Sequence, residues 1–158
     1  IKYNSNGIEF EVVYKDKRYN AGLSIPGRFS VYNALTAIGC VFALGFDMEK
    51  VVSGLKTAKG VKGRIEVVPI DTDYTVIIDY AHTPDGMRQT LLSLKSFRKN
   101  RIITVFGCGG DRDRSKRALM GKTVASFSDV AVVTSDNPRT EEPEKIIDDI
   151  FAKFCVGK

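Results

Sequence analysis

The sequence predicts an α/β fold with a parallel sheet in its second half. After residue 64, apolar segments with strand character alternate with segments of helical character, an order typical of parallel strands joined by right-handed crossovers. The later strand candidates are apolar without alternation, as expected for strands that are covered on both faces. With 158 residues, of which 43% are hydrophobic, the chain can form one full domain or one domain with part of another.

The first half predicts two strands and two helices. Residues 8–25 alternate apolar and polar side chains around a charged turn, so we expect two strands there. A helix should follow and stop at Gly45, and Asp47 is placed to cap a second helix that runs to about Thr57. The residues expected on the buried sides of these helices are Val31, Leu35, Ile38, Val41 and Leu44, then Val51, Val52 and Leu55.

The Gly- and Lys-rich segment "KGVKGR" (59–64) has no apolar periodicity. Such a break between two periodic regions is typical of a linker. We therefore predict one domain over residues 1–63 and a second over residues 64–158.

The second half predicts strands and helices in alternation. Thr83 and Pro84 suit the cap and the first position of one helix, and Ser115 suits the cap of another that ends near Ser126. A third helix is expected over 142–154. The strand candidates are 64–70, 74–81, 101–108 and 129–135.

Three polar clusters follow the apolar strands, at 79–82, 109–114 and 136–139. Ligands of open parallel sheets bind beyond the carboxyl ends of the strands, so these clusters predict a binding site. His82 is the only histidine, and no serine or cysteine set completes a catalytic triad with it. Asp79 ends an apolar strand, where its carboxylate needs a partner such as a cation, a ribose hydroxyl or metal-bound water.

Several classes of protein do not fit the composition. The three cysteines lack zinc-ligand spacing and do not form a disulfide framework, so we expect reduced thiols in a cytoplasmic protein and no metal site. No apolar run is long enough to cross a membrane, and no signal peptide opens the chain. The net charge is +5, and the most concentrated basic stretch, "DRDRSKR" (111–117), has acids interleaved and no aromatic partner. This composition argues against nucleic acid as a partner.

The segments "GRFSVYNALTA", "GVKGRIEVV", "IIDYAHTPDGM", "FGCGGDRDRSKRALMG" and "TSDNPR" together resemble the Mur ligases, in order and in spacing. The resemblance covers about residues 7 to 155. It implies the end of a central ATPase domain joined to most of a Rossmann-like C-terminal domain that binds an amino acid. Since the chain starts at Ile1 and lacks a phosphate-binding loop, we expect a truncated piece of a longer protein that is inactive alone.

The resemblance also implies a reaction: ATP-dependent amide ligation with Mg²⁺, in peptidoglycan precursor synthesis. The terminal carboxylate of UDP-MurNAc-L-Ala-D-Glu would be phosphorylated, and the amine of the incoming amino acid would attack the acyl phosphate. The small molecules ATP, UDP-MurNAc-dipeptide and diaminopimelate would be the partners, with no membrane and no nucleic acid involved. The oligomeric state stays open.

Residue roles carry over by position. Asn33, Arg64, Asp79 and His82 match the ATP-binding positions of the family, and Arg112, Asp136, Asn137, Pro138 and Arg139 match the amino-acid pocket. In that pocket, acceptors would face the ammonium group and arginines would hold carboxylates through paired hydrogen bonds. Ser30 departs from the asparagine that many relatives carry at a position that contacts the nucleotide.

The "DNPR" stretch (136–139) goes with meso-diaminopimelate in this family, whereas lysine-adding members usually lack that arginine. Diaminopimelate carries a second carboxylate, so we expect it as the substrate. The alternatives are a sister ligase, which includes lysine-adding members and folylpolyglutamate synthetases, or a catalytically silent binding module of the same fold.

Overall fold

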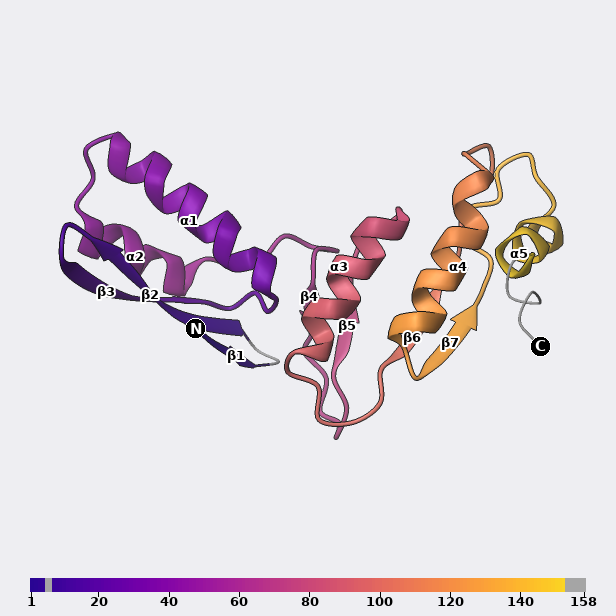
Figure 1. The fold of residues 1–158 in the computed structure, drawn as a ribbon, viewed down its shortest axis with the longest axis horizontal. Helices are drawn as coiled ribbons and strands as arrows, with labels where there is room; N and C mark the ends of the chain where they lie inside the picture. The colour runs from indigo at the N-terminus through magenta and orange to yellow at the C-terminus, as the bar shows by residue number, and fades with distance from the viewer. Residues whose placement is uncertain (5–6, 153–158) are drawn as a thin grey trace. The chain divides into compact units, whose positions relative to one another are not determined.

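The computed structural model describes residues 1–4 and 7–152, which form an α/β structure (Figure 1). The chain divides into two compact units, Ile1–Tyr80 and Ala81–Lys158. The elements of the first unit are β1 (Lys2–Asn4), β2 (Gly7–Tyr14), β3 (Lys17–Leu23), α1 (Arg28–Ala43), α2 (Met48–Thr57), β4 (Glu66–Val68) and β5 (Val76–Ile78). Those of the second are α3 (Pro84–Lys95), β6 (Ile103–Phe106), α4 (Ser115–Phe127), β7 (Val130–Val133) and α5 (Pro143–Phe151).

The first unit opens with an antiparallel sheet in the order β1-β2-β3. β2 and β3 are the two predicted strands, and β1 is an addition that the alternation did not reveal. Tyr14 pairs with Lys17, and the two residues between them have positive φ angles of 46° and 62°. A two-residue hairpin turn of this kind matches the right-handed twist of the strands it joins.

Helices α1 and α2 pack on this sheet, and the predicted stop of the first and the predicted cap of the second are both confirmed. Gly45 follows α1 with a φ of 90°, and the Asp47 carboxylate accepts hydrogen bonds from the amides of Glu49 and Lys50 at the start of α2. The shared core consists of Ile8, Phe10, Val12, Ala21, Leu23, Val31, Ala34, Ile38, Met48 and Val52.

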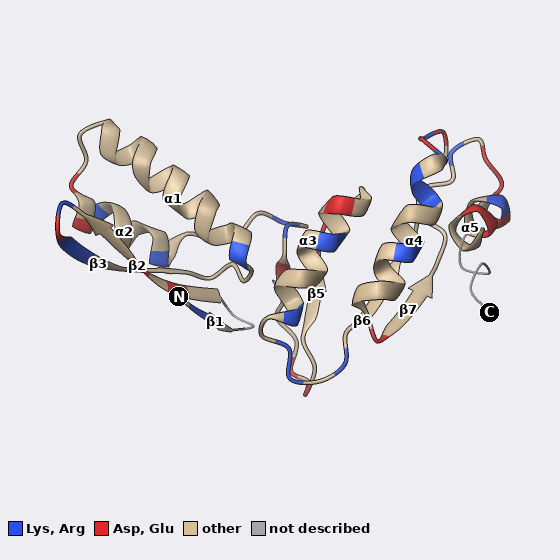
Figure 2. Cartoon of the chain, in the orientation of Figure 1, with Lys and Arg blue, Asp and Glu red and all other residues tan. Residues whose placement is uncertain are grey.

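The predicted buried side of α1 is partly wrong. Val31 and Ile38 are buried as expected, but Leu35 is 41% exposed and Leu44 76% exposed, while Ala34 takes the inner position. Arg28 is the only charged residue of this helix, which is otherwise tan in Figure 2. Apolar residues occur on several sides of this helix, so their spacing has little power to select the buried face.

Strands β4 and β5 form an antiparallel pair in which Glu66 lies opposite Ile78. Ile65, directly before β4, is buried and has a φ of 46°. A left-handed backbone is unfavourable for a β-branched residue, so the contacts around Ile65 hold it in a strained conformation.

The second unit contains the predicted parallel pair, β6 and β7, joined by the crossover helix α4. Thr83 caps α3 through its hydroxyl, and Pro84 is the first helical residue, as expected. The core of this unit is made by Met87, Leu91, Ile102, Phe106, Cys108, Met120, Val124, Ile146 and Ile150.

Two expectations about the strands need correction. The parallel arrangement holds for β6 and β7, but β5 pairs with β4 in antiparallel orientation. The strands were also expected to be covered on both faces. In the described part of the chain one face of the β6–β7 pair is instead open to solvent: Ile103, Val105, Val130 and Val132 are between 37% and 64% exposed. These four pair across the register, so they form one apolar face.

The predicted cap of α4 is also wrong. Ser115 is the first residue of the helix, and the Asp113 carboxylate accepts hydrogen bonds from both its amide and its hydroxyl, at 3.0 and 2.6 Å. The carboxylate two residues earlier competes successfully because it can accept two bonds at once. These bonds and Lys116 hold the pKa of Asp113 below its ordinary value.

The longest helix in the described residues is α1, with 16 residues. No helix there combines the length and the hydropathy that a membrane span requires.

Candidate functional site

The loops that follow β6 and β7 meet at one edge of the parallel pair. The carboxyl ends of parallel strands lie at the same edge, so residues 107–114 and 134–142 start side by side. The amide of Thr134 donates to the carbonyl of Phe106 at 2.9 Å, and the amide of Gly110 donates to the carbonyl of Asn137 at 2.8 Å. The predicted clusters at 109–114 and 136–139 are therefore brought together.

Two glycines make this close approach possible. A Cβ on Gly107 would lie 2.6 Å from the carbonyl oxygen of Thr134, and a Cβ on Gly110 would lie 1.8 Å from that of Pro138. Both distances are far below van der Waals contact with backbone atoms, which no change of rotamer can relieve. Any side chain at either position would force the two loops apart.

The predicted pocket residues lie on these loops. Arg112, Asp136, Asn137 and Arg139 are exposed, and Pro138 is half-buried. A Cβ on Gly109 would lie 3.8 Å from both the Cγ of Arg112 and the carbonyl oxygen of Asn137, so the two sequence clusters are in reach of each other.

Arg139 has a φ of 52°, and its amide donates to the Asn137 side chain at 3.3 Å. The left-handed conformation is uncommon for an arginine and is typical of residues whose direction is fixed by local contacts. The geometry therefore sets the direction in which Arg139 leaves the loop.

Three arginines on these loops, and Arg117 in the first turn of α4, fall into two groups. The guanidinium of Arg114 lies 2.8 Å from a carboxylate oxygen of Glu141, and that of Arg117 lies 2.7 Å from the other. For Arg112 and Arg139, in contrast, the described residues provide no acidic partner. Their charge is therefore available for an anionic group of a ligand.

Sequence reasoning missed the residues that join the loops, above all Arg117 and Glu141. The Arg117 side chain is only 2% exposed and donates to both Glu141 oxygens, to Asp149 at 2.8 Å and to the carbonyl of Gly109 at 3.3 Å. One signal was present: Arg117 lies at helical spacing from Met120 and Val124, which are buried. A charged residue on the apolar stripe of a helix indicates a buried ion pair.

These contacts shift the titration of the network. The Arg117 guanidinium, followed by the amide of Asp111, lowers the pKa of Glu141 from 4.5 to about 2. The hydrogen bonds that Arg117 donates to the same carboxylate raise the pKa of Arg117 above its ordinary value, although burial opposes the shift. Both groups therefore stay charged over the whole physiological range.

Cys108 belongs to the first loop and is buried. Its thiol is 3.8 Å from the sulfur of Met120, and burial raises its pKa to about 11. A thiol that stays protonated is a poor nucleophile, so Cys108 serves packing in this structure.

Arg64 and Asp79, predicted to contact ATP, are near each other in the first unit. The Arg64 guanidinium lies over the ring of Tyr80, 5.0 Å from its centroid. The Asp79 carboxylate accepts a hydrogen bond of 3.0 Å from the amide of Ile65. Asp79 thus supports the left-handed backbone at Ile65, directly after Arg64. The Ile65 amide in turn is one of the hydrogen-bond partners that a carboxylate at a strand end needs.

Of the other two predicted nucleotide residues, Asn33 is far from this pair in the chain and is exposed on α1. His82 follows Asp79 by three residues and is exposed in the segment before α3. Ser30 is buried, and its hydroxyl donates to the carbonyl of Pro26 at 3.0 Å. In this chain the Ser30 hydroxyl therefore provides a hydrogen-bond donor for a backbone carbonyl just before α1. Among the described residues, no group of three His, Cys, Asp or Glu side chains is arranged to hold a metal ion.

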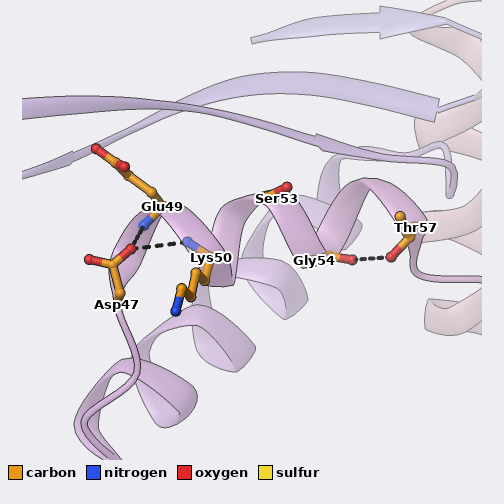
Figure 3. A pocket seen from close by; sticks show the side chains of 6 residues that line it. All are labelled: Asp47, Glu49, Lys50, Ser53, Gly54 and Thr57. Carbon is orange, nitrogen blue, oxygen red and sulfur yellow. Dashed lines mark hydrogen bonds between the residues drawn. The ribbon is translucent and has the colours of Figure 1, made fainter.

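A recess runs along α2, lined by Asp47, Glu49, Lys50, Ser53, Gly54 and Thr57 (Figure 3). Two of its polar side chains already have local partners: the Asp47 carboxylate caps the helix, and the Thr57 hydroxyl donates to the carbonyl of Gly54 at 2.9 Å. A helix start that holds its own carboxylate has little attraction for another anion. We do not assign this recess a ligand.

Comparison with known proteins identifies the family. Residues 63–156 match the family described as Mur ligase, glutamate ligase domain. The chain is 47% identical over 152 residues to a UDP-N-acetylmuramoyl-L-alanyl-D-glutamate–2,6-diaminopimelate ligase of Clostridium acetobutylicum, which covers 95% of this chain and 32% of that protein. For the ligase of the same name from Gloeobacter violaceus the identity is 54% over 134 residues, with coverage of 84% and 27%. The chain thus spans about a third of the length of the curated relatives it matches.

Solved structures agree with this assignment. A UDP-N-acetylmuramate–alanine ligase from Thermotoga maritima superimposes with a TM-score of 0.72 at 30% identity, over 95% of this chain and 33% of that one. A folylpolyglutamate synthase from Thermotoga maritima gives a TM-score of 0.75 at 21% identity, over 96% and 36%, which shows a shared fold. The chain belongs to the Mur ligase family.

Proposed function

We propose that this chain is part of an ATP-dependent ligase that adds meso-diaminopimelate to UDP-MurNAc-L-Ala-D-Glu in peptidoglycan precursor synthesis. In this proposal, residues 1–63 are the end of the ATP-binding domain and residues 64–158 belong to the amino-acid-binding domain. The start of the family match at residue 63 supports that division. Curated relatives named for this reaction are 45–54% identical to the chain, which supports the proposed substrates.

The observation that carries the proposal is the pair of arginines on adjoining loops, Arg112 and Arg139. Neither has an acidic partner in the described residues, whereas Arg114 and Arg117 beside them do. Diaminopimelate has two carboxylates, and a guanidinium can bind a carboxylate through two parallel hydrogen bonds. Asp136 and Asn137, exposed on the second loop, offer acceptors for an ammonium group.

The chemistry is a phosphoryl transfer followed by an acyl transfer. The terminal carboxylate of the dipeptide takes the γ-phosphoryl group of ATP, with ADP as the leaving group, and becomes an acyl phosphate. The amine of diaminopimelate then attacks the acyl carbon, expels phosphate and loses a proton, which leaves the amide bond. This chain's contribution is to hold and orient the amine donor, since positioning supplies much of the rate enhancement in reactions of this kind.

For the nucleotide we assign Arg64 and Asp79, with Asn33 and His82, as ATP-binding residues. Arg64 offers a positive charge that can stabilise phosphate oxygens, and its position over Tyr80 limits its freedom. ATP and Mg²⁺ supply the phosphoryl group and the charge neutralisation when bound. We assign Mg²⁺ to no residue of this chain.

We place the reaction in the cytoplasm. Among the described residues the cysteines Cys40 and Cys108 are free thiols, as expected in a reducing compartment.

The test is ligation by the full-length protein with diaminopimelate and with lysine as competing substrates. We expect diaminopimelate to be used and lysine to be used poorly. Replacing Arg139→Ala or Arg112→Ala should raise KM for diaminopimelate by about 10- to 100-fold, the value of a charge-assisted hydrogen-bonded pair, while KM for ATP stays within about twofold. Equal use of both amino acids would contradict the substrate assignment.

Arg101→Ala is the matched control. Arg101 is also an exposed arginine, but it precedes β6 and therefore lies at the opposite end of that strand from the loops. Its replacement should leave both KM values unchanged. A similar rise in KM for the control would show that general loss of positive charge, and not the loop site, explains the effect.

A further inference from the structure

The strongest contacts between the two loops come from residues outside the proposed pocket. The ion-pair network, by which we mean Arg114, Arg117, Glu141 and Asp149, is centred on the Glu141 carboxylate. Arg117 donates to its two oxygens at 2.7 and 2.9 Å, and Arg114 lies 2.8 Å from one of them. The bidentate geometry restricts distance and angle together, which a single hydrogen bond cannot do.

Glu141 also reaches the first loop directly. Its carboxylate accepts the amide of Asp111 at 2.6 Å, and the Asp111 carboxylate in turn accepts the hydroxyl of Thr140, also at 2.6 Å. Asp111 therefore donates to one residue of the second loop and accepts from its neighbour. These two bonds fix the residue immediately before Arg112.

The backbone at this point is held in an unfavourable conformation. Asp111 has a φ of 54° and Arg139 one of 52°, so each loop contains a non-glycine residue in the left-handed region. Such residues return to the ordinary regions when the surrounding contacts are lost. Loss of the Asp111 contacts would therefore swing Arg112 away from the second loop.

We infer that Arg117 and Glu141 are positioning residues of the amino-acid site: they fix the loop that carries Arg112 against the loop that carries Arg139, and so set the separation of the two guanidinium groups for a substrate with two carboxylates. This inference rests on the proposed function. Neither residue needs to touch the substrate, because the Arg117 side chain is only 2% exposed and that of Glu141 only 10%.

A purely structural role is the competing explanation, and the kinetic pattern separates the two. A structural defect lowers the amount of active enzyme, and hence kcat, with little change in KM. Loss of positioning raises KM for diaminopimelate and leaves KM for ATP unchanged. Arg117→Lys keeps the charge but not the paired hydrogen bonds, so positioning predicts that it is impaired despite its conserved charge.

The experiment uses the full-length ligase with Glu141→Gln, Arg117→Lys and the milder Thr140→Val, which removes only the hydroxyl bond to Asp111. The control is Arg98→Met, which removes an ion pair of 2.7 Å with Asp129 at the other end of the same unit. For Glu141→Gln and Arg117→Lys we expect KM for diaminopimelate to rise by about 10- to 100-fold, and for Thr140→Val by about threefold or more. KM for ATP should stay within about twofold in all of them.

Hydrogen exchange of the free protein provides a readout that does not depend on activity. The amides of Gly110 and Asp111 both donate across the loops, so they should exchange faster in Glu141→Gln and in Thr140→Val, and at the original rate in Arg98→Met. If Glu141→Gln does not fold, Thr140→Val still decides the question.

Three outcomes would overturn the inference. Unchanged exchange at Gly110 and Asp111 would show that the network does not hold the loops. Faster exchange with unchanged KM for diaminopimelate would reduce the network to a structural role. A parent protein that ligates lysine or no amino acid at all would remove the proposed function and the positioning role together, which the first two outcomes would not do.

Discussion

Replacing Gly110→Ala tests how closely the two loops must approach. A Cβ at this position would lie 1.8 Å from the carbonyl oxygen of Pro138 and 2.5 Å from its carbonyl carbon. Both atoms belong to the backbone, and Gly110 is not among the glycines with positive φ, so the destabilising effect of the methyl group is steric. To restore even a tight contact, the loops must separate by roughly 1 Å or more.

The cost follows from what that separation breaks. The hydrogen bond of 2.8 Å from the amide of Gly110 to the carbonyl of Asn137 is lost, at about 1 kcal/mol. Overpacking of the contact adds about 1–3 kcal/mol. We therefore expect the free energy of unfolding to fall by about 2–4 kcal/mol. A displacement of about 1 Å at a binding site should also lower kcat/KM for diaminopimelate by about 100-fold.

The assay is chemical denaturation of the full-length protein, with hydrogen exchange of the loop amides to locate the change. Gly54→Ala is the matched control, since no atom lies within 4 Å of a Cβ there and the residue is inside a helix. The control should be more stable than the parent by about 0.5–1 kcal/mol. A free energy of unfolding for Gly110→Ala within about 0.5 kcal/mol of the parent's value would refute the steric argument.

Three further predictions concern single groups. The folded-state pKa of Glu141 lies at about 2, below its ordinary 4.5, so its contribution to stability is complete above about pH 4.5 and is lost as the pH falls through about 2. The difference in stability between the parent and Glu141→Gln should therefore shrink over that window in acid-denaturation curves, and a constant difference would contradict the assignment. Asp47→Ala removes the acceptor for two amides of α2 and should cost about 1 kcal/mol in thermal unfolding, whereas Asp47→Ser should retain most of the stability. At pH 8, iodoacetamide should alkylate the exposed Cys40 well before Cys108, whose pKa is raised to about 11, and mass spectrometry of the peptides would reveal the opposite order if it occurred.

Local signals allowed much of the fold to be predicted. The start of α3 at Thr83 and Pro84, and the cap of α2 at Asp47, depend on side chains within three residues of the helix they begin. The parallel pair followed from the order of its elements, and the loops beyond its carboxyl ends were found where the sequence placed them. Each of these features is determined by neighbours in the chain.

The errors occurred where neighbours compete or where the partner is distant. Asp113 and Ser115 are both good capping residues, and only the geometry shows that the aspartate accepts the bonds. The apolar pattern of Ile103 and Val105 expresses a preference for burial, but it does not say which segment covers them. The pairing of Arg117 with Glu141 spans 24 residues, and no local rule connects them.

The candidate site shows the same division. The sequence identified Arg112 and Arg139 by type and by position after the strands, and the structure brings their loops together. The sequence predicted that the Asp79 carboxylate needs a partner, but it did not predict that the amide of Ile65 donates a hydrogen bond to it. That contact depends on a residue with positive φ, which is a conformation that isoleucine rarely adopts.

The dependence of the two loops on a residue buried in α4 has a consequence for engineering. A chimera that exchanges only residues 136–139 between relatives would carry the pocket side chains and leave their support behind. Arg117 donates to Glu141 in the second loop and to Asp149 in α5, so the smallest transferable unit extends from the glycines after β6 to Asp149. Attempts to change amino-acid preference should therefore exchange residues 107–149 as one block, and shorter grafts should lose affinity without gaining a new specificity.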